Sequence, residues 1–383
     1  MSNNSTNKQI LVTGGAGYIG SHTVLSLLES GFKVVILDKV PLQSVFKKSL
    51  EIFGTQVLFE QVNLLDLHNL KTIFAKYQFD GVVHFAADPA IVSQLPLHAS
   101  QYYSQNVISS INLVDTCREF GVNNFVFSST AAMYGNPETL PIKESSKLEP
   151  VNIYGYTKSV IEKMLQDYNQ VFGLNSISLR YFNACGADEQ TRTGECHSPE
   201  IHLIPCILQS IGTEKIFELY GDDYNTPDGS NVRDYIHVTD LASGHVKALE
   251  YLFNNESKSL ILSNGKVGSS LPNKASSRQA KNSIVKGLES INHQSKKPSI
   301  CEAINLGTSS GYSNKQIFKT TQKIIGQNIP LKIVGRRGSG DPGELVADNS
   351  KAKKVLGWTP TNSNLENILQ TAWNWEKVKK TLK

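Results

Sequence analysis

Short apolar runs alternate with stretches of helical periodicity through the first half of this chain. The apolar runs, which have the lengths of buried strands, lie at 9–12, 33–37, 56–61, 81–85, 124–127 and 176–181. The stretches with helical spacing of apolar residues lie at 18–29, 42–53, 67–76, 97–120 and 153–172. Strands and helices that alternate in this way build parallel sheets from βαβ units. The pattern predicts an α/β protein with a Rossmann-type, doubly wound parallel sheet.

A change of composition after Phe182 predicts a second, smaller domain, because glycine, proline and polar residues become denser there. The predicted organisation is a Rossmann-type domain at 8–182 with returns at 233–262 and 301–308, and a smaller α/β domain at 183–232 and 309–383. The returning part includes a helix near 240–253 and a strand near 303–307. Further helices are expected at 313–325 and after Pro360.

The segment 263–300 is rich in serine and lysine and has few large apolar residues. Between residues 264 and 300, seven lysines and arginines accompany a single acidic residue, Glu289, so the rest of the chain is net negative despite the overall charge of +4. Such a segment buries too little surface to offset its ordering entropy. We expect a mobile basic insertion; a docking segment for an acidic partner is the alternative. The negative remainder argues against nucleic acid as a partner.

No run of about 18 apolar residues is present, and the polar residues 1–8 lack the apolar centre of a signal peptide. We expect a cytoplasmic protein that does not associate with membranes. The cysteines lack a CxxC or metal-type spacing and are interpreted as reduced thiols, with no metal site. They are Cys117, Cys185, Cys196, Cys206 and Cys301.

A glycine-rich turn follows the first apolar run. Gly14 allows the chain to reverse, Gly17 allows backbone N–H groups to approach phosphate oxygens, and Gly20 allows the next helix to pack closely on the strand. Unpaired N–H groups and the helix dipole favour an anion at that helix N-terminus. The next strand ends in Asp38, where a carboxylate can bind a ribose diol and repel a 2′-phosphate. These residues predict a dinucleotide site that prefers NAD to NADP.

The ends of the next two strands provide further candidates. Asn63 follows the third strand and is a candidate contact for adenine, with a plain strand-end polar residue as the alternative. Ala86 and Ala87 follow the fourth strand, where small residues let the chain pass close beneath a flat cofactor. His84 lies inside that strand and is interpreted as a hydrogen-bonded core residue rather than a base.

Tyr154 and Lys158 are four positions apart at the start of a predicted helix, so their side chains share one face. Tyrosine titrates at about 10, too high for a base at neutral pH. An ammonium about 4 Å away contributes about 4 kcal/mol at an effective dielectric near 20, or roughly 3 pKa units. We therefore expect Lys158 to lower the pKa of Tyr154 toward the range of a general base. The hydroxyls of residues 128–130 are candidates to hydrogen-bond a substrate oxygen.

Two long helical stretches, 97–120 and 153–172, have apolar positions wide enough to face both a sheet and a partner. Such faces favour association of two copies of the chain. They predict a homodimer whose interface is a four-helix bundle.

Five stretches form a combined signature. They are Thr13-Gly14-Gly15-Ala16-Gly17-Tyr18-Ile19-Gly20-Ser21-His22, His84-Phe85-Ala86-Ala87, Tyr154-x3-Lys158, Arg180-Tyr181-Phe182-Asn183 and Val232-Arg233-Asp234-Tyr235-Ile236-His237-Val238. Together they resemble the extended short-chain dehydrogenase/reductases, most closely the UDP-glucose 4-epimerases. The resemblance runs from about Gln9 to Trp375, interrupted by the insertion, and implies a tightly held NAD+ and a UDP-sugar substrate.

The reaction implied by this resemblance starts at the sugar 4-hydroxyl. Tyr154 takes the hydroxyl proton, Thr130 shares the hydrogen bond, and the C4 hydride moves to the nicotinamide. The 4-keto sugar then turns and receives the hydride on its other face. The implied cofactor residues are Gly14, Gly17, Tyr18, Ile19, Gly20, Asp38, Asn63, Phe85, Ala86, Ala87, Asn106, Tyr154, Lys158 and Tyr181. The implied substrate residues are Thr130, Asn183, Leu203, Tyr220, Arg233, Arg336, Arg337 and Asp341.

Some positions depart from the family pattern. The family often has aspartate where Asn63 stands and serine where Thr130 stands; an amide can still meet adenine, and threonine keeps the hydroxyl. An extra residue within 338–340 leaves Arg336 and Arg337 as alternatives for the diphosphate. Leu345 occupies the position that gates the sugar 2-substituent, and its size leaves both glucose and N-acetylglucosamine open.

The sequence leaves three alternatives to a UDP-glucose 4-epimerase. One is a 4-epimerase of another UDP-sugar, with an N-acetylhexosamine, pentose or uronate. A 4,6-dehydratase is disfavoured because residues 128–133 lack the Asp-Glu pair needed to eliminate water. A non-catalytic NAD-binding regulatory protein would not need the intact pair of Tyr154 and Lys158.

Overall fold

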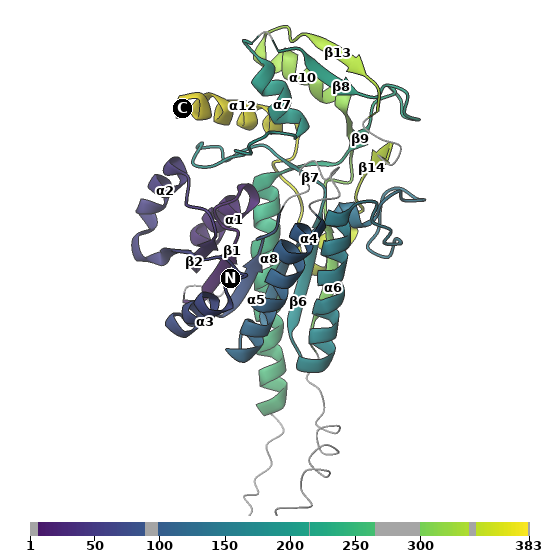
Figure 1. Ribbon diagram of the computed structural model, residues 1–383. Helices are drawn as coiled ribbons and strands as arrows, with labels where there is room; N and C mark the ends of the chain where they lie inside the picture. The colour runs from purple at the N-terminus through teal and green to yellow at the C-terminus, as the bar shows by residue number, and fades with distance from the viewer. Residues whose placement is uncertain (1–6, 89–98, 214, 265–298, 337–341, 382–383) are drawn as a thin grey trace, which may run out of the picture.

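The computed structural model describes residues 7–88, 99–213, 215–264, 299–336 and 342–381. Within them, seven parallel strands form the main sheet in the order β11-β6-β5-β4-β1-β2-β3 (Figure 1). The strands are β1 (Gln9–Thr13), β2 (Lys33–Asp38), β3 (Val57–Gln61), β4 (Gly81–His84), β5 (Asn124–Thr130), β6 (Asn175–Tyr181) and β11 (Cys301–Leu306). The strand order reverses between β1 and β4, the type of position where open α/β sheets bind ligands. The predicted Rossmann-type fold is confirmed.

Helices and short helical turns connect these strands. Those of the first part of the chain are α1 (Tyr18–Glu29), α2 (Ser44–Leu50), η1 (Glu51–Gln56), α3 (Leu67–Lys76), α4 (Ala99–Tyr102), η3 (Tyr103–Ile108), α5 (Ser109–Glu119), η4 (Ala131–Met133) and α6 (Ile153–Phe172). Those of the second part are α7 (Leu203–Ser210), α8 (Val238–Asn264), α10 (Asn314–Ile325), α11 (Ser350–Leu356) and α12 (Leu365–Thr381).

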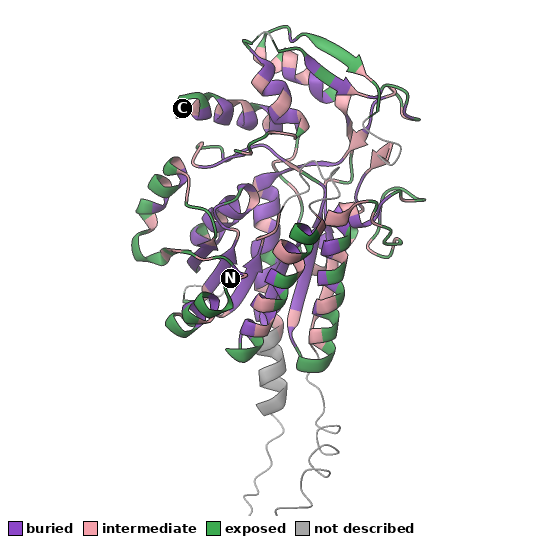
Figure 2. Cartoon of the chain, viewed as in Figure 1, coloured by how far each residue is buried: buried purple, intermediate pink, exposed green. Residues whose placement is uncertain are grey.

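The sheet is buried between two helical layers because successive strand residues point to opposite faces. On one face, Val12 and Ile36 pack in a cluster with side chains of α1, α2, α8 and α11. On the other face, Leu11 and Val35 pack with side chains of α3, α5 and α6. Figure 2 shows the consequence: the central strands are almost entirely buried, and the outer sides of α3, α5 and α6 are exposed. The edge strand β3, by contrast, has no fully buried residue.

A smaller lobe lies beyond the carboxyl ends of the main-sheet strands (Figure 1). Its apolar core joins α7, α10 and α12 to β8 and includes Ile207, Phe217 and Ile368. The short strands of this region are β7 (Asn183–Cys185), β8 (Phe217–Tyr220), β9 (Val232–Arg233), β10 (Tyr235–His237), β12 (Tyr312–Ser313), β13 (Leu331–Val334) and β14 (Glu344–Leu345). The lobe therefore closes over the edge of the sheet where the predicted site residues lie.

Two predicted helices differ in the structure. The stretch predicted at 42–53 divides into α2 and the 3₁₀ turn η1, where Gly54 has a φ of +52°. The single helix predicted at 97–120 is instead α4, the π-helical segment η3 and α5. A π turn adds one residue to the helix circumference and is frequent at functional sites; here it contains the fully buried Asn106.

Other expectations have simpler outcomes. The predicted insertion at 263–300 lies almost entirely outside the described residues. The five cysteines all lie in described parts of the chain and are free thiols. Among the described helices, none combines the length and apolar character needed to cross a membrane.

Candidate active site

The turn between β1 and α1 is shaped by glycines whose missing side chains leave room for backbone. Gly14 has a φ of +72°, and a Cβ atom there would lie 2.6 Å from the backbone nitrogen of Ala86. A Cβ on Gly20 would lie 2.2 Å from the carbonyl oxygen of Gly14. Gly17 is the N-cap of α1, and no side chain of the described residues caps the helix there. The turn thus brings β1, β4 and an uncapped helix N-terminus together, a geometry suited to a pyrophosphate.

Asp38 lies at the end of β2, beside the glycine turn. Its carboxylate accepts hydrogen bonds from the backbone N–H groups of Ala16, at 3.0 Å, and Val40, at 3.2 Å. Burial raises the pKa of Asp38, and the backbone hydrogen bonds oppose that rise. The carboxylate is thereby fixed at the edge of the turn, where it can accept hydrogen bonds from a ribose diol.

A cavity of about 610 Å³ joins this turn to the ends of β4, β5 and β6. Its size is in the range of cofactor and ligand sites. The predicted residues that line it are Gly14, Gly17, Tyr18, Ile19, Gly20, Asp38, Asn63, Phe85, Ala86, Ala87, Thr130, Tyr154, Lys158, Tyr181, Asn183 and Leu203. Residues from separate strands and helices therefore meet around one space.

Other predicted residues lie outside this lining. Asn106 accepts a hydrogen bond from the Asp88 N–H at 2.7 Å and donates one to Thr157 Oγ at 3.0 Å. The wider π turn thus ties the segment after β4 to α6, and Asn106 is placed to support the cavity wall. His84, between Thr13 and Ser110 at 2.7 and 2.9 Å, has the buried, hydrogen-bonded position expected of a core residue.

The described residues predicted to hold the nucleotide end of the substrate but absent from the cavity lining, Tyr220, Arg233 and Arg336, lie in the smaller lobe. Arg233 Nη1 donates to the carbonyl of Val232 at 2.8 Å. Arg336 donates to Asp223 Oδ1 at 2.7 Å and lies over the ring of Tyr224. The Tyr220 hydroxyl donates to Glu218 at 3.2 Å. Neither Tyr220 nor these arginines line the cavity formed by the described residues, and Arg337 and Asp341 lie outside the described residues.

Leu345, the predicted gate for the sugar 2-substituent, lies in β14. It packs against a buried cluster that includes Ala131, Tyr134 and Phe182. The cluster adjoins the end of β5, directly after Thr130. Leu345 therefore lies behind the strand end that carries the candidate hydroxyl.

The beginning of α6 places the reactive side chains. Asn152 caps the helix by accepting from the Gly155 N–H at 2.8 Å. Gly155 allows close packing on the turn η4, which follows β5, since a Cβ there would lie 2.7 Å from the carbonyl oxygen of Ala132. Tyr154 is consequently close enough to hydrogen-bond Thr130. This pair points into the cavity that the glycine turn also lines.

Lys158 is buried one turn further along α6. Its ammonium donates to the carbonyl oxygen of Ser128 at 2.7 Å and lies 5.7 Å from the centre of the Tyr154 ring. Burial lowers the pKa of Lys158 to about 7, and Glu162 partly opposes the shift. The end of β5 thus contacts both residues of the Tyr-x3-Lys pair.

The expected lowering of the Tyr154 pKa by Lys158 is wrong for this arrangement of the chain. Burial raises the pKa of Tyr154 to about 12, and the hydrogen bond with Thr130 only partly offsets the rise. The sequence argument counted the attraction between phenolate and ammonium but not the removal of water from both groups. Burial therefore opposes the expected lowering of the Tyr154 pKa in two ways. It disfavours the phenolate of Tyr154, and it also favours the neutral form of Lys158.

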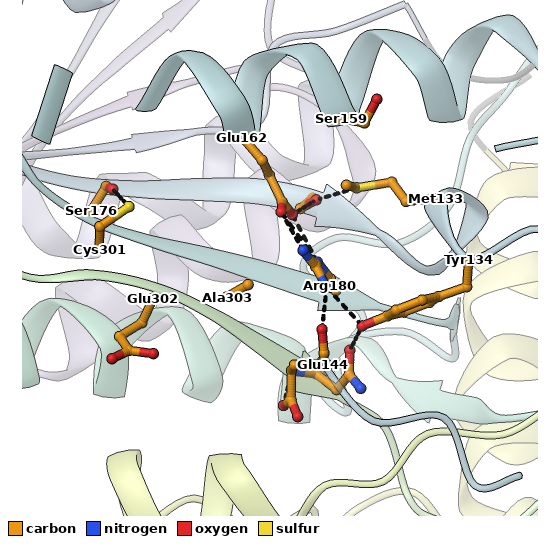
Figure 3. A network of polar contacts seen from close by, with 12 residues as sticks. Met133, Tyr134, Glu144, Ser159, Glu162, Ser176, Arg180, Cys301, Glu302 and Ala303 are labelled. Carbon is orange, nitrogen blue, oxygen red and sulfur yellow. Dashed lines mark hydrogen bonds and ion pairs between the residues drawn. The ribbon is translucent and has the colours of Figure 1, made fainter. Parts of the chain in front are cut away.

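A buried ion pair that the sequence analysis missed lies behind this site (Figure 3). Glu162, one turn after Lys158 on α6, accepts from Arg180 of β6 at 2.5 Å, and each side chain is only 5% exposed. Ser129 of β5 donates to the same carboxylate at 2.5 Å, and Arg180 also donates to the Tyr134 hydroxyl at 3.0 Å. The network joins α6 to β5 and β6. The sequence contained one indication of this ion pair, namely Arg180 inside the apolar strand at 176–181, because a buried arginine requires a partner.

The cavity wall also contains residues that were not predicted. Glu195, His197 and His202 reach it from the segment before α7, and Trp375 reaches it from α12. The indole of Trp375 donates to the carbonyl oxygen of Glu195 at 2.8 Å. The only available signal was an unusual concentration of histidine and glutamate at 195–202.

Comparison with known proteins agrees with this geometry. Residues 10–261 match the NAD dependent epimerase/dehydratase family. The UDP-glucose 4-epimerase of Halalkalibacterium halodurans is 41% identical over 369 residues, which cover 96% of this chain and 95% of that protein. The chain belongs to the NAD-dependent epimerase/dehydratase family.

Solved structures of this family share the whole architecture. A UDP-glucose 4-epimerase from Brucella ovis in complex with NAD has a TM-score of 0.77 at 36% identity, covering 96% of this chain and 98% of that one. The Stenotrophomonas maltophila enzyme with bound NAD and formylated UDP-arabinopyranose has a TM-score of 0.82 at 31% identity, covering 98% and 100%. The predicted enzyme class and nicotinamide cofactor are confirmed.

The residues of this NAD-dependent epimerase/dehydratase fit such a cofactor. Gly17 leaves the backbone open where a dinucleotide fold brings pyrophosphate close to it, and Gly14 and Gly20 allow β1, β4 and α1 to pack closely around the turn. Asp38 stands where the fold holds the adenine-side ribose, and a carboxylate there favours NAD over NADP.

Proposed function

We propose that this protein is a UDP-glucose 4-epimerase that interconverts UDP-glucose and UDP-galactose through a transient 4-keto sugar. The hydrogen-bonded pair of Tyr154 and Thr130, which lines the same cavity as the glycine turn, carries the proposal. The names of the full-length relatives and the UDP-sugar bound to the Stenotrophomonas neighbour support it.

The chain's own residues supply proton transfer and orientation. Bound NAD+ supplies the acceptor and later the donor of the hydride at sugar C4, together with a positive charge that favours the Tyr154 phenolate. Tyr154 holds the proton of the sugar 4-hydroxyl at its phenolic oxygen. Thr130 hydrogen-bonds the same group and fixes its direction. Lys158, held by the Ser128 carbonyl, places its amino group near the phenol.

Anchoring of the substrate is assigned to the smaller lobe. A sugar that turns between two hydride transfers must be bound through another part of the substrate, and the nucleotide diphosphate is the part available for this. Arg233 and either Arg336 or Arg337 offer planar donor forks suited to phosphate. Asn183, Leu203, Tyr220 and Asp341 complete the proposed substrate site.

The test is turnover of UDP-galactose without added cofactor. We expect the purified protein to form UDP-glucose, and Tyr154→Phe to lower kcat by about 10²- to 10⁴-fold, the usual contribution of a positioned acid or base. Tyr156→Phe is the matched control, because Tyr156 is half exposed on the same helix. Near-normal turnover by Tyr154→Phe would refute the assigned base, and net release of NADH would refute epimerisation. A panel of UDP-linked N-acetylhexosamines, pentoses and uronates then ranks the alternative substrates.

We also propose that two copies associate through a four-helix bundle of α5 and α6. Large apolar side chains are exposed along this side of the molecule, and the bundle would cover Tyr103, Ile108, Ile111, Tyr156 and Val160. The five cysteines, all free thiols, support a cytoplasmic enzyme.

The proposed interface predicts the effect of one added charge. Val160→Glu buries a carboxylate in the bundle and should convert the dimer to monomers at micromolar concentration in sedimentation velocity experiments. Ile333→Glu, at an equally exposed apolar position on β13, is the control and should leave the dimer intact. If both variants sediment like the wild type, the interface lies elsewhere.

A further inference from the structure

The segment between β7 and α7 brings two imidazoles and two carboxylates together. Glu195, His197, Glu200 and His202 each offer one ligand atom, and these atoms all lie within 4.8 Å of one another. His197 Nδ1 lies 2.9 Å from Glu195 Oε1, and His202 Nδ1 contacts the same oxygen. Two imidazole nitrogens therefore converge on one carboxylate.

Glu200 carries a second, independent feature. Its side chain is 3% exposed, and its Oε1 atom accepts the backbone N–H groups of Ile201 at 2.9 Å and His202 at 3.1 Å. Its other oxygen, Oε2, is buried and has no hydrogen-bond partner among the described residues. An unpaired buried carboxylate oxygen is costly, so each such atom requires an explanation.

We propose that Glu195, His197, Glu200 and His202 form a binding site for a divalent zinc-type cation in the wall of the cofactor cavity. Two nitrogen and two carboxylate donors suit Zn²⁺, whereas Mg²⁺ and Ca²⁺ favour shells made of oxygen. A bound cation takes the place of the imidazole protons between His197, His202 and Glu195, and it gives Glu200 Oε2 a partner.

The distances leave a small adjustment for binding. Zinc bonds imidazole nitrogen and carboxylate oxygen at about 2.0–2.2 Å, so tetrahedral ligand atoms lie about 3.4 Å apart. Ligand atoms at the present upper limit of 4.8 Å would move together by about 1 Å, whereas His197 Nδ1 and Glu195 Oε1, now 2.9 Å apart, would separate slightly. His197 and His202, which are 28% and 50% exposed, have room to make them.

The backbone of the site is already held in place. The Glu195 carbonyl accepts the Trp375 indole N–H at 2.8 Å, and Gly194 lies directly beneath that indole. The cation would hold residues 195–202 together, and the hydrogen bond from Trp375 to the Glu195 carbonyl links this segment to the C-terminal helix.

The first experiment measures zinc on the untagged, full-length protein. After treatment with a chelator, the protein is titrated with Zn²⁺ in competition with a chromophoric chelator, and bound metal is counted by mass spectrometry. We expect one zinc per chain and at least about tenfold weaker affinity in Glu200→Gln, the order of loss expected when a group that supports a metal is altered. Glutamine can still accept both backbone hydrogen bonds, so the local fold should persist, and unchanged circular dichroism checks this.

Two control variants test whether zinc binds to these four residues and not to other histidine or cysteine side chains of the chain. Cys196→Ser removes the adjacent exposed thiol, and His68→Gln removes an exposed histidine far along the sequence; both should bind zinc like the wild type. Cobalt binding to the wild type should give the visible bands of a four-coordinate site without a thiolate charge-transfer band, and zinc should raise the Tm of the wild type but not of Glu200→Gln. Absence of stoichiometric zinc, unchanged affinity in Glu200→Gln, or loss of binding in Cys196→Ser would overturn the proposal.

Discussion

The two ends of the cavity achieve their shape by different means. At the glycine turn, recognition depends on backbone and on the absence of side chains, because added atoms at Gly14 or Gly20 would overlap neighbouring backbone. At the reaction end, it depends on buried side chains that can carry charge: Tyr154, Lys158 and Glu162. Substitutions at the glycine turn should therefore act mainly through added side-chain volume, and substitutions at the reaction end through altered charge.

The largest effect is expected from removing charge behind the reaction end. Glu162→Gln keeps the shape of the side chain but leaves Arg180 buried without its counter-ion, which should lower the free energy of unfolding by about 3–5 kcal/mol. The measurement is urea denaturation at neutral pH. Asp167→Asn, which breaks the exposed ion pair with Lys163 on the same helix, should cost at most about 1 kcal/mol. Equal losses of unfolding free energy in the two variants would show that the buried charges at the reaction end are no more important for stability than exposed ones.

A smaller effect is expected from adding volume at the glycine turn. Gly14 and Gly121 have φ angles of +72° and +75°, but a Cβ at Gly121 meets no atom within 4 Å. Gly121→Ala should therefore show only the backbone strain of a positive φ, about 1 kcal/mol or somewhat more. Gly14→Ala adds overlap with Ala86 and should also lose most of its bound NAD, measured as nucleotide released on denaturation. Similar NAD content in the two variants would contradict the volume argument.

The smallest effects should separate the two ends by pH. Burial lowers the pKa of Lys158 in the folded protein to about 7, against 10.5 for a lysine in water, so between these values the unfolded chain binds the extra proton. Stability contributed here rises with pH through this window, by at most about 1.4 kcal/mol per pH unit. His84, beside the glycine turn, has a folded pKa lowered by burial to about 3 from 6.5, so its contribution is lost as pH falls from about 6.5 to about 3.

Substitutions assign each window to its residue. In cofactor-free protein, Lys158→Met should flatten the rise of the free energy of unfolding between pH 7.5 and 9.5, and His84→Gln should reduce the loss below pH 6.5. Urea titrations at a series of pH values measure both slopes. If either substitution leaves its own window unchanged, that group does not titrate as the structure indicates.

Features encoded by neighbouring residues were predictable from the sequence. The predicted helices at 67–76 and 153–172 match α3 and α6, and the glycine turn lies where the first apolar run ends. Tyr154 and Lys158 are close because helical spacing alone brings them to one face. Such features depend on periodicity and on backbone geometry over a few residues.

Features that depend on distant segments were not predictable in this way. Glu162 and Arg180 meet only because α6 packs across β6, and the π turn at 103–108 leaves the apolar pattern of the helix almost unchanged. The pKa of Tyr154 was predicted in the wrong direction because its burial is a property of the assembled cavity. The reacting residues could be located from the sequence, but their exposure to water depends on how the whole chain folds.

The position of α12 has a consequence for the order of events during synthesis. Ala372, Trp375, Glu376 and Lys379 of this helix line the same cavity as the glycine turn, which is translated much earlier. Nascent chains generally fold from the N-terminus, so the turn can form long before this part of the cavity wall is translated. Stable capture of a dinucleotide should therefore begin only after residues 365–381 emerge, which makes it a late step in the life of each new molecule.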